Sequence, residues 1–275
     1  SNSLRPTAGG GHNEKMSRTA SSALTVTFAG SGDAFGSGGR YQACIHLRPE
    51  GAAPVLLDCG ATSLSALKRL GLDPGEITAV LVSHLHGDHF GGLPFMILDG
   101  QFSRRTRPLA VIGPPGTARR LADTMECLFP GSSGVSRRFD VNVTELTPGT
   151  VLAVSGETGC DATVQAWAGD HPSGAPALVL RLSLAGRTIA YTGDTAWNSA
   201  IGEAAADADL LIAEAYYQDK NIPFHLRLAD LEAHRGQITA RRVILTHMSA
   251  DMLGRPSGTD GTHFGRAHDG LTIRL

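Results

Sequence analysis

The stretch SHLHGDHF, residues 83–90, carries three histidines and an aspartate within six positions. The apolar residues 77–82 come directly before it and predict a buried strand. Side chains i and i+2 point to the same side of a strand end, so His84 and His86 can bind one metal ion. The turn that follows lets Asp88 and His89 face a second ion. Imidazole and carboxylate are ligands of zinc, iron and manganese, so we predict a metal site rather than a solvated histidine-rich loop.

The His-x-His-x-Asp-His pattern after a hydrophobic strand resembles the metallo-β-lactamase superfamily. The resemblance implies an α+β fold, a four-layer αββα sandwich in a single domain, with a two-metal site at the edges of its sheets. It extends from about residue 24 to the end of the chain, so we expect a hydrolase domain over residues 23–275. Residues 1–22 are polar and rich in Gly and Ser, and we expect a disordered tail, in part a remnant of expression.

The overall composition gives no sign of a protein that binds nucleic acid through global charge or that spans a membrane. The chain has 275 residues, 41% of them hydrophobic, which is enough for one large domain with a full core. The net charge of -2 gives no global basic field. Four cysteines without CxxC spacing suit a reducing cytosol, so we expect a cytoplasmic location. We expect no membrane association, because no apolar run approaches the roughly 20 residues that span a bilayer, and no secretory signal.

The basic residues are almost all arginines, and several lie in local clusters. Runs of charge are usually solvated surface, which is the interpretation that we favour, and a phosphate-binding rim is the alternative. The clusters are Arg104, Arg105 and Arg107, then Arg119 and Arg120, then Arg137 and Arg138.

Three further predicted strands end next to a candidate metal ligand. Residues 163–167 precede His171, residues 187–191 precede Asp194, and residues 243–246 precede His247. The resemblance implies that one metal ion is held by His84, His86 and His171. It implies that a second ion is held by Asp88, His89 and His247, with Asp194 bridging both. We expect two divalent ions, zinc in the first place and manganese or iron as alternatives, because N and O ligands serve all three.

The expected charge of this site favours hydrolysis of an anionic substrate. Two divalent ions bring four positive charges, and Asp88, Asp194 and a bridging hydroxide return three, which leaves about +1. A metal-bridging hydroxide is then the expected nucleophile, and a phosphodiester is the expected substrate. His86 stands where the diiron oxygen-reducing members typically carry Glu, so redox chemistry is not expected. The alternatives are hydrolysis of a sulfate ester, lactone, thioester or β-lactam, or a non-catalytic metal-binding or RNA-binding module.

Glu214 and His225 resemble a pair found in the ribonuclease Z-like branch of the superfamily. In that branch a Glu orients a His that assists the leaving group, and Asp88, Glu214 and His225 are the catalytic residues that the resemblance implies. A carboxylate raises the pKa of a neighbouring histidine and fixes its tautomer. Ala213 and Leu226-Arg227 depart from the motifs of the branch, and a capping or surface histidine is the alternative for His225.

Members of this branch that process tRNA often carry a long tRNA-gripping arm between the third-motif histidine and the bridging aspartate. Asp194 follows His171 by only 23 positions, which two predicted strands fill. We therefore expect a compact phosphodiesterase that acts on a small anionic or phosphodiester substrate and not on tRNA. The branch is often dimeric, so the resemblance also allows a homodimer.

Other segments give expectations for the rest of the fold. Asp58, after an apolar strand, is expected to support the ligand loop or to cap a helix. The glycine-rich run 30–40 precedes a strand rather than a helix, which excludes a dinucleotide-binding turn. Residues 141–146, 151–154 and 163–167 predict antiparallel strands of a second sheet, and residues 254–270 an irregular loop. The histidines without motif context are expected to be structural or on the surface: His12, His46, His234, His263 and His268.

Overall fold

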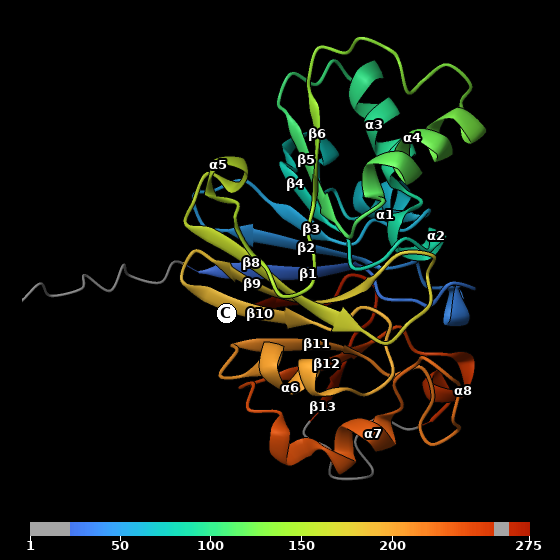
Figure 1. Cartoon of the computed structure of the whole chain (residues 1–275), viewed down its shortest axis with the longest axis vertical. Helices are drawn as coiled ribbons and strands as arrows, with labels where there is room; N and C mark the ends of the chain where they lie inside the picture. Colours follow the sequence, from blue (N-terminus) through green and yellow to red (C-terminus); the bar gives the residue numbers. More distant parts are fainter. Residues whose placement is uncertain (1–22, 256–263) are drawn as a thin grey trace, which may run out of the picture.

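The computed structural model describes residues 23–255 and 264–275, so the expected tail with His12, and also His263, lie outside the described residues. Within these ranges, two seven-stranded sheets pack face to face, and helices lie on their outer faces (Figure 1). This arrangement is the four-layer αββα sandwich, and it confirms the predicted α+β single-domain fold. Of the helices in the described ranges, none is both long and apolar enough to cross a membrane.

The first sheet combines an antiparallel half with a parallel half. Its antiparallel strands are β14 (Thr272–Arg274), β1 (Leu24–Gly30), β2 (Cys44–Pro49) and β3 (Val55–Leu57). Its parallel continuation is β4 (Ala79–Leu81), β5 (Leu109–Gly113) and β6 (Val141–Glu145).

The placement of residues 141–146 in an antiparallel second sheet was wrong. Strand β6 pairs parallel with β5, with Val143 opposite Val111. The helix between the two strands returns the chain to the edge at which β5 began, and such a crossover places the next strand parallel to the first.

The second sheet is also mixed. Its antiparallel part consists of β7 (Val151–Ala153), β8 (Ala162–Gly169), β9 (Ala177–Leu184) and β10 (Arg187–Tyr191), which agrees with the prediction for residues 151–154 and 163–167. Its parallel part adds β11 (Leu210–Glu214), β12 (Val243–Thr246) and β13 (Phe264–Arg266). Strand β13 lies within residues 254–270, where we predicted only a loop, and three residues are too few for a readable period of two.

Among the described residues, seven helices lie on the outer sides of the two sheets. The first sheet is covered by α1 (Ser63–Arg69), α2 (Gly87–Phe90), α3 (Leu93–Phe102) and α4 (Thr117–Leu128). The second is covered by α6 (Ser199–Ala205), α7 (Leu228–Ala233) and α8 (Ala250–Leu253) (Figure 1). The short α5 (Ser155–Thr158) lies apart from them, at the left in this view, and three single turns are η1 (Ser37–Gly39), η2 (Pro74–Glu76) and η3 (Arg235–Gln237).

The main core lies between the two sheets, and two further cores lie under the helices. Ala79 and Leu81 of β4 belong to the core between the sheets, whereas Val80 packs under the helices of the first sheet. Side chains alternate between the two faces of a strand, and both faces of β4 are covered. A strand that is buried on both faces reads as a continuous apolar run, which explains residues 77–82.

The topology sets where the candidate ligands meet. Strands β8 and β10 run in the same direction because each is antiparallel to β9, and β11 and β12 run parallel to β10. Their carboxyl ends therefore share one edge of the second sheet, at the right in Figure 1. Helix α2, which follows β4 of the first sheet, lies at the same edge. We call this the ligand edge, and we call the edge beside α5 the opposite edge.

Candidate metal centre

The loop after β4 is held in place by close backbone contact with the turn after β3. The amide of Cys59 donates to the carbonyl of His89 at 2.7 Å, and the amide of Gly92 donates to the carbonyl of Cys59 at 2.8 Å. A Cβ atom on Gly60 would lie 2.2 Å from the carbonyl oxygen of Asp88. Glycine at this position therefore allows two turns to touch, and the contact fixes the direction in which the loop presents its side chains.

The structure brings three of the predicted ligands together as one group. The nitrogen atoms of His84, His86 and His171 lie within 4.8 Å of one another. Each pair of these rings has its centroids 4.9 Å apart, and Nε2 of His171 lies 3.0 Å from Nδ1 of His86. Three imidazoles that converge from two loops in this way form a donor set suited to one zinc-like ion.

A second group contains the other four predicted ligands. Asp88, His89, Asp194 and His247 are all buried, and their ligand atoms also lie within 4.8 Å of one another. Oδ2 of Asp88 lies 3.2 Å from Nε2 of His89 and 3.1 Å from Nε2 of His247. His247 has a positive φ of 56°, a strained conformation that turns its ring from the end of β12 into the group.

Asp194 lies between the two groups. Its carboxylate is 3.2 Å from Nε2 of His89, 3.5 Å from Nε2 of His247 and 4.0 Å from Nε2 of His84. Nε2 of His84 is buried and has no hydrogen-bond partner among the described residues. A buried polar atom without a partner is costly unless something else binds it. The donor types and this unpaired nitrogen therefore fit divalent ions on either side of Asp194.

Asp58 supports the loop after β4 by hydrogen bonds to Ser83 and His89. Its carboxylate accepts hydrogen bonds from the amide of Ser83 at 2.7 Å, from the Ser83 hydroxyl at 2.8 Å and from Nδ1 of His89 at 2.7 Å. The hydroxyl of the fully buried Tyr191 donates to the same carboxylate at 2.7 Å. Such partners fix the tautomer of a histidine and direct Nε2 into the site. Asp58 is not a helix cap, because α1 begins after Thr62.

Glu214 and His225 lie together beside Asp194, and His225 is half-buried rather than a surface residue. Nδ1 of His225 lies 2.5 Å from Oε1 of Glu214 and 3.9 Å from Oδ2 of Asp194. The other carboxylate oxygen of Glu214 accepts from the amides of Thr195 and Leu226. Glu214 thus ties the ends of β10 and β11 to the loop that carries His225, although Ala213 and Leu226-Arg227 depart from the motifs of the branch.

Two contributors to the site are not visible in the sequence as functional residues. One is Tyr191, which reads as an ordinary strand residue of β10. The other is the backbone of Phe224, whose carbonyl accepts a hydrogen bond from Nδ1 of His171 at 3.0 Å. Phe224 has a positive φ of 66°, which is unusual for an aromatic residue. A signal for such a backbone contact does not exist in a single sequence, because any residue can supply a carbonyl.

The charge balance of the two groups favours cations. Burial lowers the pKa of His84 well below its usual value, and the neighbouring His89 acts in the same direction, so His84 is neutral as a metal ligand must be. Burial also acts to lower the pKa values of His89 and His247, but Asp194 and the adjacent carboxylates raise both well above the usual value. Without metal, these histidines carry protons that balance Asp88 and Asp194. Divalent ions would replace those protons.

Three further histidines of the described residues, His46, His234 and His268, lie away from both groups. His46 is buried in β2, its ring Nε2 has no hydrogen-bond partner among the described residues, and burial lowers its pKa to about 4. His234 stacks on Trp197 with ring centroids 4.1 Å apart. His268 is exposed. The expectation of structural or surface roles agrees with these positions.

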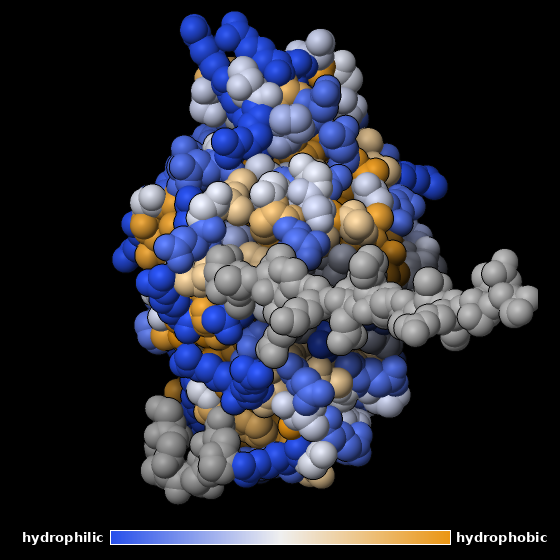
Figure 2. Space-filling model, turned by 90° about the vertical axis from the view of Figure 1, so that its left-hand side faces the viewer, coloured by the Kyte–Doolittle hydropathy of each residue, from blue (hydrophilic) through white to orange (hydrophobic). Residues whose placement is uncertain are grey.

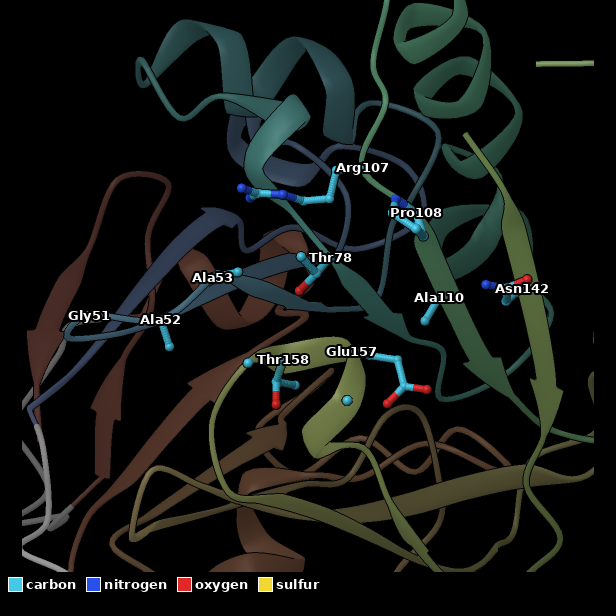
Figure 3. Close-up of a pocket in the computed structure, with 12 residues that line it drawn as sticks. Gly51, Ala52, Ala53, Thr78, Arg107, Pro108, Ala110, Asn142, Glu157 and Thr158 are labelled. Carbon is cyan, nitrogen blue, oxygen red and sulfur yellow. The ribbon is translucent and has the colours of Figure 1, made fainter. Parts of the chain in front are cut away.

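A cavity lies at the opposite edge of the molecule, and none of the candidate metal ligands lines it. Figure 2 faces this edge, where hydrophilic residues are interspersed with small hydrophobic areas. The cavity has a volume of about 550 Å³, and Figure 3 shows Arg107 and Glu157 on different sides of it. Its lining contains no histidine, cysteine or aspartate. The candidate functional site is therefore the one at the ligand edge, because convergent titratable groups and not volume provide chemistry.

The chain matches known proteins over most of its length. A model of the β-lactamase superfamily domain matches residues 45–248. Ribonuclease Z of Methanosarcina acetivorans is 27% identical, over 82% of this chain and 88% of that protein. The crystal structure of human tRNase Z, short form, superimposes with a TM-score of 0.72 and 28% identity, over 90% of this chain and 98% of that chain. The metallo-β-lactamase fold protein YhfI of Bacillus subtilis has a TM-score of 0.73 at 19% identity, over 92% of this chain and 100% of that chain, which shows the fold alone.

These similarities correct one prediction, because the exclusion of tRNA was wrong. It rested on the short distance between His171 and Asp194, which β9 and β10 indeed fill. The relatives are nevertheless named ribonuclease Z, and one solved neighbour is a tRNase Z that this chain matches over nearly its whole length. The absence of one insertion is therefore not a valid argument against tRNA, because contacts from other parts of a fold can bind it.

The same similarities confirm the resemblance to the metallo-β-lactamase superfamily and the resemblance to its ribonuclease Z-like branch. The superfamily model includes His84, Asp194 and His247. The relatives named ribonuclease Z and tRNase Z confirm a metal-dependent hydrolase of the phosphodiesterase kind. The chain therefore belongs to the β-lactamase superfamily, and within it the chain is similar to the proteins named ribonuclease Z.

Proposed function

We propose that residues 23–275 form a dinuclear-metal phosphodiesterase that cleaves RNA, with tRNA precursors among its substrates. The observation that carries the proposal is the position of Asp194, whose carboxylate lies within 4.0 Å of ring nitrogens from both histidine groups. One carboxylate between two such groups is the arrangement expected of a bridging ligand. The names of the relatives support RNA as the substrate.

In this proposal each group holds one ion. His84, His86 and His171 would hold the first, and Asp88, His89 and His247 the second, with Asp194 between them. Two divalent ions, zinc in the first place, would supply a water of lowered pKa as nucleophile and would neutralise charge on the phosphate. Asp58 and the Phe224 carbonyl would keep the ligand rings in their orientation, each through the Nδ1 atom of a histidine.

His225 would provide the proton for the leaving oxygen. Its Nδ1 is engaged by Glu214, so Nε2 is the ring nitrogen that would act on the substrate. The ring lies between His171 and Tyr216, with centroid distances of 4.9 Å and 5.1 Å, so it is packed beside the first ion site. Burial opposes protonation of His225, but the hydrogen bond from Nδ1 to Glu214 and the charge of that carboxylate raise its pKa. A histidine that holds its proton can deliver it to a departing alkoxide.

The test is metal content together with turnover of two phosphodiesters. The purified protein is assayed for metal and for hydrolysis of bis(p-nitrophenyl) phosphate and a tRNA precursor, before and after chelation. We expect about two ions per chain and cleavage of both substrates that chelation abolishes and added zinc or manganese restores.

Other outcomes would change the proposal in distinct ways. Two ions with cleavage of carboxyl esters or thioesters, but of neither phosphodiester, would overturn the substrate class and retain the site. One ion per chain at full activity would contradict the bridging role of Asp194. No bound metal after addition of zinc or manganese would contradict the ligand assignment itself.

A further inference from the structure

A pair of adjacent arginines lies beside the loops that carry candidate metal ligands. Arg119 and Arg120 are in the first turns of α4, and both are exposed. A cavity of about 330 Å³ lies between this part of the helix and two loops that carry candidate ligands. We call these the ligand loops: the loop after β4, with His84 and His86, and the loop after β8, with His171. The lining of the cavity includes Leu85, which lies between His84 and His86 in the sequence, and Gly174 and Ala175, which follow His171 closely.

The two arginines are available to a ligand because their present contacts are weak. Arg120 reaches the carbonyl of Leu85 only at 3.5 Å, a marginal hydrogen bond. Arg119 lies 3.6 Å from Asp123, and both of these side chains are mostly exposed, so the pair is weak in water. A Cβ atom on Gly174 would lie 3.3 Å from Nη2 of Arg120, so a larger residue there would crowd the guanidinium.

The charges that line this cavity favour an anion. It is lined by the side chains of Arg119, Arg120 and Asp123, so the two guanidinium groups outnumber the one carboxylate. The amino end of α4 adds little to this charge, because the Glu145 carboxylate already accepts a hydrogen bond from the Ala118 amide at 3.2 Å. Guanidinium groups match phosphate oxygens in geometry and charge.

We propose that Arg119 and Arg120 form a phosphate-binding subsite, which binds a second phosphate of a polynucleotide while a neighbouring phosphodiester occupies the metal centre. This inference rests on the proposed function and extends it to the substrate class, because a substrate with a single phosphate cannot use the subsite. Leu85 provides the link, since it contacts Arg120 and lies between two candidate ligands. A polynucleotide that leaves the metal centre along the loop containing Leu85 would reach these arginines.

The chain offers a matched control in a second adjacent pair, Arg241 and Arg242. Both are exposed, and Arg241 lies 3.5 Å from Asp209, much as Arg119 lies 3.6 Å from Asp123. This pair directly precedes β12, whereas the candidate ligand His247 follows the same strand. Replacement of either pair by glutamine removes two positive charges, but only Arg119 and Arg120 border the ligand loops.

The first test measures binding without turnover. A fluorescein-labelled single-stranded RNA is titrated into EDTA-treated full-length protein at several salt concentrations, and anisotropy gives the affinity. We expect R119Q/R120Q to bind about tenfold more weakly at low salt and to lose about 1.4 from the slope of log K against log salt, which corresponds to two contacts on a single strand. R241Q/R242Q should match the wild type, and R119K/R120K should recover most of the affinity.

An equal loss in both glutamine pairs would overturn the subsite, since it would show a general effect of charge. So would unchanged affinity in R119Q/R120Q, or no RNA binding by the wild type.

The second test compares substrates with the metal-loaded enzyme. We expect R119Q/R120Q to lose about tenfold more kcat/KM on the RNA than on bis(p-nitrophenyl) phosphate, mainly through KM, at unchanged metal content. Equal losses on the two substrates would assign these arginines a structural role and overturn the inference. If the wild type cleaves neither phosphodiester, the proposed function fails, and the binding titration still decides whether the arginines bind a polynucleotide.

Discussion

The ligand edge and the opposite edge of the molecule carry different kinds of groups. At the ligand edge, buried ionisable side chains converge, and Asp58, Phe224 and His247 adopt positive φ angles. At the opposite edge lies the larger cavity, bordered by the exposed side chains of Arg107 and Glu157 (Figure 3). Arg107 there donates to the backbone carbonyl of Glu76 at 3.0 Å.

The difference shows that volume alone does not identify a functional site in this fold. Buried charge destabilises a folded chain, so it persists where the surrounding structure holds it for a purpose. The opposite edge has neither a convergent ligand set nor a buried carboxylate among its lining residues. Each prediction below changes one side chain, either at the ligand edge or away from it. If the two kinds of change have equal effects, the functional difference between the regions is contradicted.

The largest effect is expected at Asp194. Asp194→Asn keeps the shape of the side chain but removes the charge that the two histidine groups share. We expect turnover of bis(p-nitrophenyl) phosphate to be abolished and metal content to fall below that of the wild type. This loss should exceed the roughly 10–100-fold that removal of a ligand's hydrogen-bond partner costs.

The control for Asp194 is Glu157→Gln, which also removes one carboxylate, but at the opposite edge. It should keep wild-type turnover and metal content. Loss of activity in Glu157→Gln with retention in Asp194→Asn would reverse the comparison and move the functional site to the other cavity.

An intermediate effect is expected at His225, which separates a proton donor from a merely nearby histidine. His225→Gln keeps a hydrogen-bonding side chain but cannot deliver a proton, so we expect kcat to fall about 100-fold with metal content unchanged. The loss should shrink on substrates whose leaving groups need no proton, such as p-nitrophenolate esters. Steady-state kinetics on leaving groups of increasing pKa measure this dependence.

His234→Gln is the matched change for His225, because His234 is also half-buried but stacks on Trp197 away from the ligands. We expect it to leave kcat unaltered for every leaving group. A uniform loss in His225→Gln across all leaving groups would contradict proton donation and leave only a role in packing.

The smallest effect is expected at His46, a buried histidine that belongs to neither group of candidate metal ligands. Burial, with a smaller contribution from Arg48, lowers its pKa from 6.5 to about 4, against the opposing charge of Glu76. The folded protein therefore holds it neutral, and stability is lost as the pH falls from 6.5 toward 4. For His46→Leu, we expect the loss in free energy of unfolding between pH 7 and pH 5 to be smaller by roughly 2 kcal/mol.

Urea unfolding of the metal-free protein at the two pH values measures the effect at His46. An equal acid-induced loss in the wild type and the variant would show that His46 is protonated in the folded state. Binding of zinc by His46 would contradict the comparison. It would show that a single buried histidine binds metal without the converging ligands found at the ligand edge.

The sequence by itself determined the residue types of the site and their places at strand ends. These follow from local physics, because an apolar run predicts a strand, and the residues just after it are read directly. His84, His86, Asp88 and His89 could be predicted in this way, whereas Asp194 as a bridging ligand came from the family resemblance. The layered fold followed from the same pattern of alternating strands and helices together with the family resemblance.

Only the tertiary structure decided which strand ends meet and what supports them. The pairing of β6 with β5, the hydrogen bond from Tyr191 to Asp58 and the carbonyl of Phe224 on His171 are contacts between distant parts of the chain. Arg119 and Arg120 could not be distinguished from other arginine clusters until α4 lay beside Leu85. A sequence pattern reports the environment of neighbouring residues, whereas these contacts depend on how two sheets and their helices pack.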